Sequence, residues 1–89
     1  MTPRTMKKQK PPPYSTVVGR FLRLERECKK TSLSEIAKAL GYSTSGWSRV
    51  ETGETPISVD QLKRACDVLK TTPHALIEEA DTFWKRNYT

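Results

Sequence analysis

The sequence has little of what membrane and secreted proteins require. Hydrophobic residues make up 35% of its 89 positions, and no apolar run approaches the roughly 18 residues of a membrane span. The amino terminus is basic, but no apolar stretch follows it, so we expect no secretory signal. These absences predict a protein that contacts no membrane and stays in the cytoplasm.

Cysteine and histidine are also scarce. Cys28 and Cys66 have no CxxC partner, and His74 is the only histidine. A tetrahedral zinc site needs about four such ligands at close spacing, so we predict no metal site and no cofactor. The count allows a disulfide between the two cysteines, but two small buried side chains in a reducing cytosol are the simpler interpretation.

Features that indicate an enzyme are missing as well. Cysteine and histidine do not pair at a recognisable catalytic spacing, and the four glycines form no loop that could cradle a phosphate. No stretch alternates apolar and polar residues as a strand does. The sequence therefore predicts an all-α protein that is not an enzyme, and no small-molecule ligand is evident.

Positive charge is what the sequence has in excess. The formal net charge is +6. Residues 1–30 hold nine lysines and arginines against two acids, a balance of +7, whereas residues 31–89 hold seven bases and eight acids, a balance of −1. A basic patch of this kind attracts phosphate backbones of any sequence. A polyanionic partner is one interpretation, and a solvated basic face is the other.

The chain divides into an arm, a domain and a short extension. Residues 1–13 are basic and end in three prolines, which indicates a disordered arm with a stiff polyproline spacer. We expect the folded domain over residues 14–80. Residues 81–89 form an extension that is rich in aromatic side chains.

Periodicity predicts a first helix at the start of the domain. Ser15 is expected to cap this helix, which runs to about Lys29. Gly19 lies inside it and indicates a close contact with another part of the chain. Its apolar stripe consists of Val18 and Leu22, with Phe21 and Cys28 on the flank. A second face, expected to be solvated, carries Arg20, Arg23 and Arg26.

Capping signals predict two short helices next. Ser32 and Glu35 form a capping box, in which each side chain bonds the other residue's backbone amide. The helix that they begin ends at Gly41, which can adopt the left-handed conformation. Ser43 then caps a third helix, expected over residues 44–52.

Two further helices follow. A second capping box, residues 58–61, begins a helix whose inner side is expected to carry Val59, Leu62, Ala65, Cys66 and Leu69. Thr72 and Pro73 begin a fifth helix, with Leu76, Ile77 and Ala80 inside it and Phe83 and Trp84 beyond it.

The second and third helices, joined by three residues, have the pattern of a helix-turn-helix. Such a joint makes the helices cross steeply, so a small residue such as Ala37 is needed where they meet. The apolar residues expected to hold them together are Ile36, Leu40, Tyr42, Trp47 and Val50. The outer side of residues 44–52 then remains available to a partner.

Residues 18–77 resemble a Cro/C1-type (XRE family) helix-turn-helix domain. Residues 32–41, Ser-Leu-Ser-Glu-Ile-Ala-Lys-Ala-Leu-Gly, resemble the second helix of that family. Residues 47–53, Trp-Ser-Arg-Val-Glu-Thr-Gly, resemble the end of its recognition helix. The resemblance implies a five-helix lambda-repressor-like fold with the motif at residues 32–52. Leu33, Gly46 and Trp47 depart from the usual family pattern.

The resemblance implies a DNA-binding mechanism. The second helix of the motif enters the major groove, while the first crosses the phosphate backbone. The residues expected to contact bases are Thr44, Ser45, Ser48 and Arg49. The residues expected to contact phosphates are Ser32, Ser34, Ser43 and Tyr42. Arg49 has the best chemistry for readout, because its guanidinium can bridge guanine O6 and N7.

Several of these residues have a second interpretation. Arg49 can instead pair with Glu51 or another acid on the surface, and Glu51 is expected to brace the loop that follows the helix. Tyr42 can lie at the rim of the core. The lysines of the arm are Lys7, Lys8 and Lys10. They either contact DNA or belong to a tail that keeps the protein soluble.

The aromatic residues after the fifth helix suggest a dimer. These residues are Phe83, Trp84 and Tyr88. They can close the core over the first helix, or they can form a two-fold contact between two copies of the chain. We expect a homodimeric transcription regulator, a repressor on a palindromic operator in double-stranded DNA, associated with the nucleoid when bound. The alternative is an antitoxin or adaptor whose main partner is another protein.

Overall fold

The computed structural model describes residues 10–88 and contains, within that range, five α-helices and no strand. The all-α, five-helix expectation is confirmed. The helices are α1 (Tyr14–Cys28), α2 (Leu33–Leu40), α3 (Thr44–Thr52), α4 (Val59–Val68) and α5 (Pro73–Tyr88).

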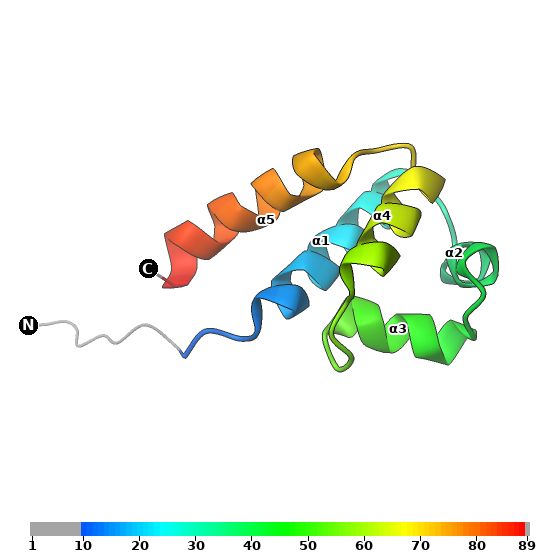
Figure 1. Ribbon diagram of the computed structural model, residues 1–89, viewed down its shortest axis with the longest axis horizontal. Helices are drawn as coiled ribbons and strands as arrows, with labels where there is room; N and C mark the ends of the chain where they lie inside the picture. Colours follow the sequence, from blue (N-terminus) through cyan, green and yellow to red (C-terminus); the bar gives the residue numbers. More distant parts are fainter. Residues whose placement is uncertain (1–9, 89) are drawn as a thin grey trace, which may run out of the picture.

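Helix α1 is the element around which the others are arranged. It contacts both α3 and α5, and α2 contacts α3 and α4. Figure 1 shows α5 running along α1, with α2 and α3 on the other side of the molecule. The core between the helices is mainly apolar, and its largest fully buried side chains are Trp47, Leu22, Ile36, Leu69, Leu76 and Val17.

Helix α1 begins one residue before the cap that we predicted. Pro13 is the cap residue, and its carbonyl accepts a hydrogen bond from the Thr16 amide at 2.9 Å. No side chain caps the helix, and Ser15 lies inside the first turn. The prediction for Ser15 was therefore wrong. The proline side chain has no oxygen that could accept from an amide, so the Pro13 carbonyl is what bonds the first turn.

The two helices of the motif have the predicted bounds. The Ser32 hydroxyl accepts from the Glu35 amide at 3.0 Å, and Glu35 accepts from the Ser32 amide at 2.8 Å. Gly41 ends α2 in the left-handed conformation, with φ at 80°. The Ser43 hydroxyl accepts from the Gly46 amide at 3.0 Å and begins α3. Each boundary follows from a local signal.

Helix α4 begins at the predicted capping box but differs in its inner side. Leu62, Ala65 and Cys66 are buried, and Leu69 is buried just after the helix. Val59, however, is 81% exposed, so its placement on the inner side was wrong. It is the first residue of α4, where the helix has not yet reached the core.

Helix α5 is longer than the sequence suggested. It continues to Tyr88, so Phe83 and Trp84 lie within the helix rather than beyond it. Residues 81–88 contain no glycine or proline that would end a helix. The extension is therefore continuous with the helix that carries Leu76 and Ala80.

Helix α5 is attached to α1 by aromatic rings. Trp84 packs on Tyr14 with ring centroids 5.0 Å apart, and Phe83 meets Phe21 edge-on at 5.7 Å. Tyr88 contacts both Phe83 and Trp84. All of these rings are half-buried. Within one chain, the aromatic residues therefore close the core over α1, which was one of the two predicted roles.

The two cysteines lie in different environments and are both free. Cys66 is buried in the core, and this burial raises the pKa of its thiol. Cys28 is exposed at the end of α1. The prediction of two buried side chains therefore holds for Cys66 and was wrong for Cys28.

Candidate nucleic-acid interface

The outer side of α3 carries the side chains that the sequence assigned to base contacts. Thr44, Ser45 and Arg49 are exposed, and Ser48 is half-buried. Three of these four side chains are short, so DNA could approach the helix backbone closely. The helix thus presents three hydroxyl groups and one guanidinium to the solvent.

The inner side of α3 is held by the core. Trp47, Val50 and Glu51 are buried, and Trp47 is completely inaccessible to solvent. Gly19 of α1 lies against this side, because a Cβ atom there would collide with the backbone carbonyl of Val50. The close contact predicted at Gly19 is therefore the contact between α1 and α3.

A buried ion pair links α1 to α3. Arg26 donates two hydrogen bonds to the Glu51 carboxylate, from Nε at 2.8 Å and from Nη2 at 3.0 Å. Its Nη1 donates to the Thr31 carbonyl at 2.9 Å. The indole Nε1 of Trp47 donates to the same carboxylate at 2.8 Å. Glu51 thus accepts three hydrogen bonds from two helices.

This network corrects one expectation. Arg26 was placed on a solvated face together with Arg20 and Arg23, but it is buried, whereas those two are exposed. A buried charge is tolerated when it is paired and its polar atoms are hydrogen-bonded. Glu51 supplies the pair, so it braces α3 itself against α1.

The residues proposed for phosphate contacts lie near the two helix starts and the turn between them. Ser32, Ser34 and Ser43 are exposed, and Tyr42 is half-buried. The Tyr42 hydroxyl accepts a hydrogen bond from Gln61 Nε2 at 2.7 Å, and its ring lies 5.8 Å from that of Trp47. Tyr42 is therefore at the rim of the core with its hydroxyl bonded to α4.

The partner of Arg49 within the chain is Glu54. Arg49 Nε lies 3.7 Å from Glu54 Oε1, and both side chains are mostly exposed. Glu51 is occupied by Arg26 and Trp47 on the opposite side of the helix. Arg49 was expected to pair with Glu51 or with another acid on the surface, and in the structure it pairs with another acid, Glu54.

Of the arm lysines, the structure describes only Lys10, which is exposed. Lys7 and Lys8 lie outside the described residues. Lys10 is followed by Pro11, Pro12 and Pro13, which lead directly into α1.

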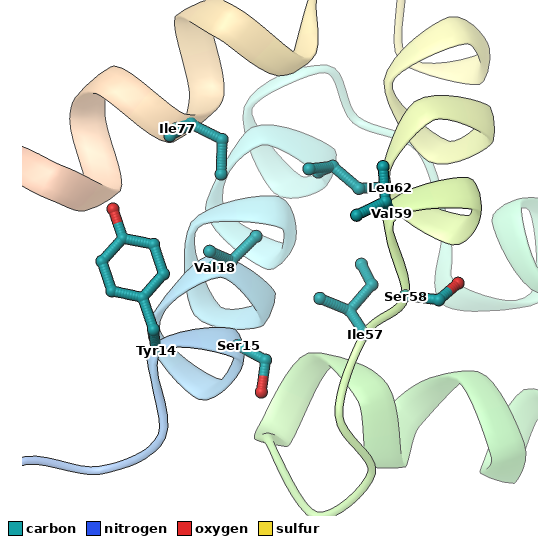
Figure 2. A pocket seen from close by; sticks show the side chains of 8 residues that line it. All are labelled: Tyr14, Ser15, Val18, Ile57, Ser58, Val59, Leu62 and Ile77. Atoms are coloured by element: carbon teal, nitrogen blue, oxygen red, sulfur yellow. The ribbon is translucent and has the colours of Figure 1, made fainter.

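An apolar groove lies away from the outer side of α3. It has a volume of about 170 Å³ and is open to solvent. Figure 2 shows Val18 and Ile77 facing Ile57, Val59 and Leu62 across it, from α1, α5, the loop after α3 and α4. No residue of α2 or α3 lines it, so it is separate from the helix-turn-helix surface.

Other kinds of site are not found in residues 10–88. In that range, no group of three histidine, cysteine or acidic residues could hold a metal ion. Nor is any helix of this range both long and apolar enough to span a membrane.

The sequence analysis missed the roles of three residues around α3 and the turn before it. Arg26 could have been found, because it continues the spacing of Val18 and Leu22 at four-residue intervals. Gln61 was recognised only as part of a capping box. Glu54 carries no periodic or capping signal, since its position depends on how the loop folds.

Comparison with protein families and solved structures agrees with this geometry. A family described as a helix-turn-helix domain matches residues 17–80. No curated protein matches the sequence. The clp gene regulator ClgR from Corynebacterium glutamicum has a similar structure, with a TM-score of 0.77, 28% identity, and coverage of 81% of this chain and 94% of that one.

Two further structures are regulators or resemble them. The master regulator of biofilm formation SinR, solved in complex with DNA, has a TM-score of 0.59 at 31% identity, covering 67% of this chain and 97% of SinR. An XRE-family-like protein from Pseudomonas syringae shares the fold at 23% identity, with a TM-score of 0.68 and coverage of 79% and 85%.

One similar structure is an enzyme. Hydroxypropylphosphonic acid epoxidase from S. wedmorenis has a TM-score of 0.60 at 30% identity, but the match covers 70% of this chain and only 33% of the epoxidase. The similar chains that are matched over most of their length are regulators or XRE-like. The chain therefore belongs to the helix-turn-helix family of DNA-binding transcription regulators.

Proposed function

We propose that the protein binds a specific sequence in double-stranded DNA through α3 and represses transcription from a palindromic operator as a dimer. The observation that carries this proposal is the division of α3 into a fixed inner side and an exposed outer side. A helix held rigidly by the core can present its outer side chains to base edges without first becoming ordered. We place this activity in the cytoplasm, on nucleoid DNA, with no catalytic role.

Base readout falls to Thr44, Ser45, Ser48 and Arg49. The guanidinium of Arg49 can donate to both O6 and N7 of a guanine. The three hydroxyl side chains are short and can contact a thymine methyl group or several bases weakly. The proposal thus has one strong base contact and several weak ones.

Phosphate contacts position the domain. The capping hydroxyls of Ser32 and Ser43 use an oxygen lone pair inside the chain, which leaves the hydroxyl proton free to donate to a phosphate. The Tyr42 hydroxyl is likewise an acceptor toward Gln61 and can donate outward. Ser34 is exposed near the start of α2, so it can add a further contact.

A dimer would provide the binding area that one domain lacks. A single small module buries roughly 600–1,000 Å² on DNA, which is little for strong specific binding. The half-buried rings of Phe83, Trp84 and Tyr88 leave apolar surface on α5 for a two-fold contact. Two half-sites about 34 Å apart would then be expected, and sedimentation gives the mass that decides this point.

The arm is proposed to follow the DNA backbone with Lys7, Lys8 and Lys10. Replacing all three with alanine should flatten the salt dependence of DNA binding, since fewer counterions are released. Sequence preference should not change. An unchanged salt slope would assign the arm a different role.

Selection of binding sites from random DNA tests the central proposal. The wild type should enrich one sequence, and Arg49→Ala should lower affinity for it by about 1–3 kcal/mol and relax the preference at one base pair. If both proteins enrich the same sequence equally, Arg49 does not read a base. If neither enriches any sequence, the function is not sequence-specific DNA binding.

A protein partner is the second candidate function, and the apolar groove lined by Ile57, Val59 and Ile77 favours it. An antitoxin or adaptor would bind its partner there or through a chain terminus. Charge reversal at Arg49 separates the two functions, because it should abolish DNA binding and leave a protein complex intact.

A further inference from the structure

The loop after α3 folds back onto the last turn of that helix. Gly53 adopts the left-handed conformation, with φ at 91°. The Thr55 amide donates to the Arg49 carbonyl at 3.1 Å, and the Thr52 hydroxyl donates to the same carbonyl at 3.2 Å. Thr52 and Thr55 are thus both hydrogen-bonded to the residue that carries the proposed guanine contact.

Helix α1 fixes this loop from the other side. Thr16 is buried, and its hydroxyl donates to the Gly53 carbonyl at 3.4 Å. A Cβ atom on Gly53 would collide with the Thr16 side chain, so the loop lies against α1 with no spare room. The backbone on both sides of Glu54 is therefore fixed, at Gly53 and at Thr55.

The result is an acid beside the arginine on the DNA-facing helix. Glu54 Oε1 lies 3.7 Å from Arg49 Nε, with the two side chains 70% and 62% exposed. Within residues 10–88, the Arg49 side chain donates no hydrogen bond. The acid thus lies beside the Nε of the guanidinium, and no hydrogen bond inside this range occupies the terminal nitrogens Nη1 and Nη2.

We propose that Glu54 is a positioning residue that determines specificity through Arg49. Its carboxylate restricts the guanidinium so that Nη1 and Nη2 point away from the loop, where a guanine edge can accept from both. Its negative charge also opposes the close approach of phosphates, which weakens binding to DNA of any sequence. The inference rests on the proposed function, since it requires that Arg49 contacts a base.

The expected size of the effect follows from the exposure of the pair. Exposed ion pairs of this kind contribute little, and their loss corresponds to a change of roughly two- to fivefold in an equilibrium constant. The two effects differ in what they change. Loss of positioning lowers affinity for the preferred sequence alone, whereas loss of the charge raises affinity for all DNA, because every sequence has the same phosphate backbone. Only the first effect changes the specificity ratio.

The test compares Glu54→Gln with a matched control, Glu27→Gln. Glu27 also pairs with an arginine Nε, that of Arg23 at 3.2 Å, and the side chains of this pair are 49% and 55% exposed. Binding to the selected sequence, to its single-base variants and to random DNA is measured for each protein. Glu54→Gln should lower discrimination at the base pair read by Arg49 by roughly two- to fivefold, and Glu27→Gln should not.

A double variant separates positioning from simple electrostatics. In an Arg49→Ala background, Glu54→Gln should no longer change discrimination at that base pair, but it should still raise affinity for random DNA. If Glu54→Gln lowers discrimination equally with and without Arg49, the acid does not act through the arginine and the inference is overturned.

Failure of the inference can be told from failure of the proposed function. If Arg49→Ala relaxes one base pair and Glu54→Gln leaves every preference intact, the inference is wrong and the function stands. If the wild type enriches no DNA sequence, both are wrong.

Discussion

Two polar contacts anchor other helices to α1, and they differ mainly in burial. Toward the carboxyl end of α1, Arg26 pairs with Glu51 of α3, whose side chain is 3% exposed. At its amino end, the Tyr14 hydroxyl donates to Asp81 of α5 at 2.9 Å, and the Asp81 side chain is 41% exposed. A carboxylate therefore accepts hydrogen bonds from α1 in both places, once inside the core and once close to solvent.

The difference in burial decides what each contact contributes. A carboxylate in the core needs its partners, because an unpaired buried charge costs several kcal/mol. A carboxylate at the surface can exchange its partner for water at little cost. Around Tyr14 and Asp81 the aromatic rings therefore supply most of the stabilisation, whereas the ion pair itself is essential around Glu51.

The largest expected effect comes from breaking the buried contact. Glu51→Ala leaves the buried Arg26 charge without an acid and the Trp47 indole N–H without an acceptor, so we expect a loss of about 3–5 kcal/mol in the free energy of unfolding. Urea unfolding followed by circular dichroism measures it. Arg49→Ala, on the exposed side of the same helix, is the control and should change stability by less than about 0.5 kcal/mol.

If Glu51→Ala does not fold, Glu51→Gln keeps the comparison testable. The amide oxygen can still accept from one donor, so its loss should be smaller than that of the alanine variant. Equal stabilities for Glu51→Gln and Arg49→Ala would show that the buried pair is not what holds α3.

The next largest effect is expected in the aromatic cluster. Trp84 is half-buried against Tyr14 and Tyr88, so Trp84→Ala should cost roughly 2 kcal/mol, about half of the loss for a fully buried tryptophan. Thermal unfolding at neutral pH measures it. A loss as large as that of Glu51→Ala would contradict the view that the two ends of α1 differ.

The sequence predicted best what depends on neighbouring residues. The bounds of α2 and α3 follow from Ser32, Ser43 and two glycines, because caps and left-handed helix ends are local structures. The division of α3 into inner and outer sides follows from its helical period and from the family resemblance. The proposed base-contacting residues all lie on α3, where that period places them.

What the sequence could not predict depends on residues far apart in the chain. Arg26 looked like a surface residue because its partner, Glu51, is 25 positions away. Val59 and Cys28 lie near helix ends, where the periodic pattern continues but the core does not. Lys30 and Lys70 take the left-handed conformation at helix ends, although glycine is the residue that signals it.

A smaller effect is expected where α1 and α3 touch without a charge. Gly19→Ala puts a methyl group against the Val50 carbonyl, and overpacking of this kind costs about 1–3 kcal/mol. Alanine is the better helix former by about 1 kcal/mol, so the net loss should be roughly 1 kcal/mol. Urea unfolding measures it, with Arg20→Ala on the exposed side of α1 as control. A net gain in stability would mean that the two helices can separate at no cost.

The smallest effect concerns pH at the exposed contact. The hydrogen bond from Tyr14, together with Lys85, holds the pKa of Asp81 below its usual value. A depressed carboxyl pKa stabilises the fold above the unfolded-state value, about 3.9, and this stabilisation is lost as pH falls through the folded-state pKa. Asp81→Asn should therefore change the melting temperature little at neutral pH and make its decline below about pH 4 shallower.

The control for this variant is Asp67→Asn. Asp67 pairs with Lys63 four residues earlier, at 2.8 Å, much as Asp81 pairs with Lys85 four residues later. In the described chain, however, no tyrosine hydroxyl donates to Asp67. If the two variants flatten the acid decline equally, the Tyr14 contact adds nothing. A shallower decline in Asp81→Asn alone would show that even a half-exposed carboxylate responds to the docking of α5 on α1, because that docking delivers the Tyr14 hydroxyl to Asp81.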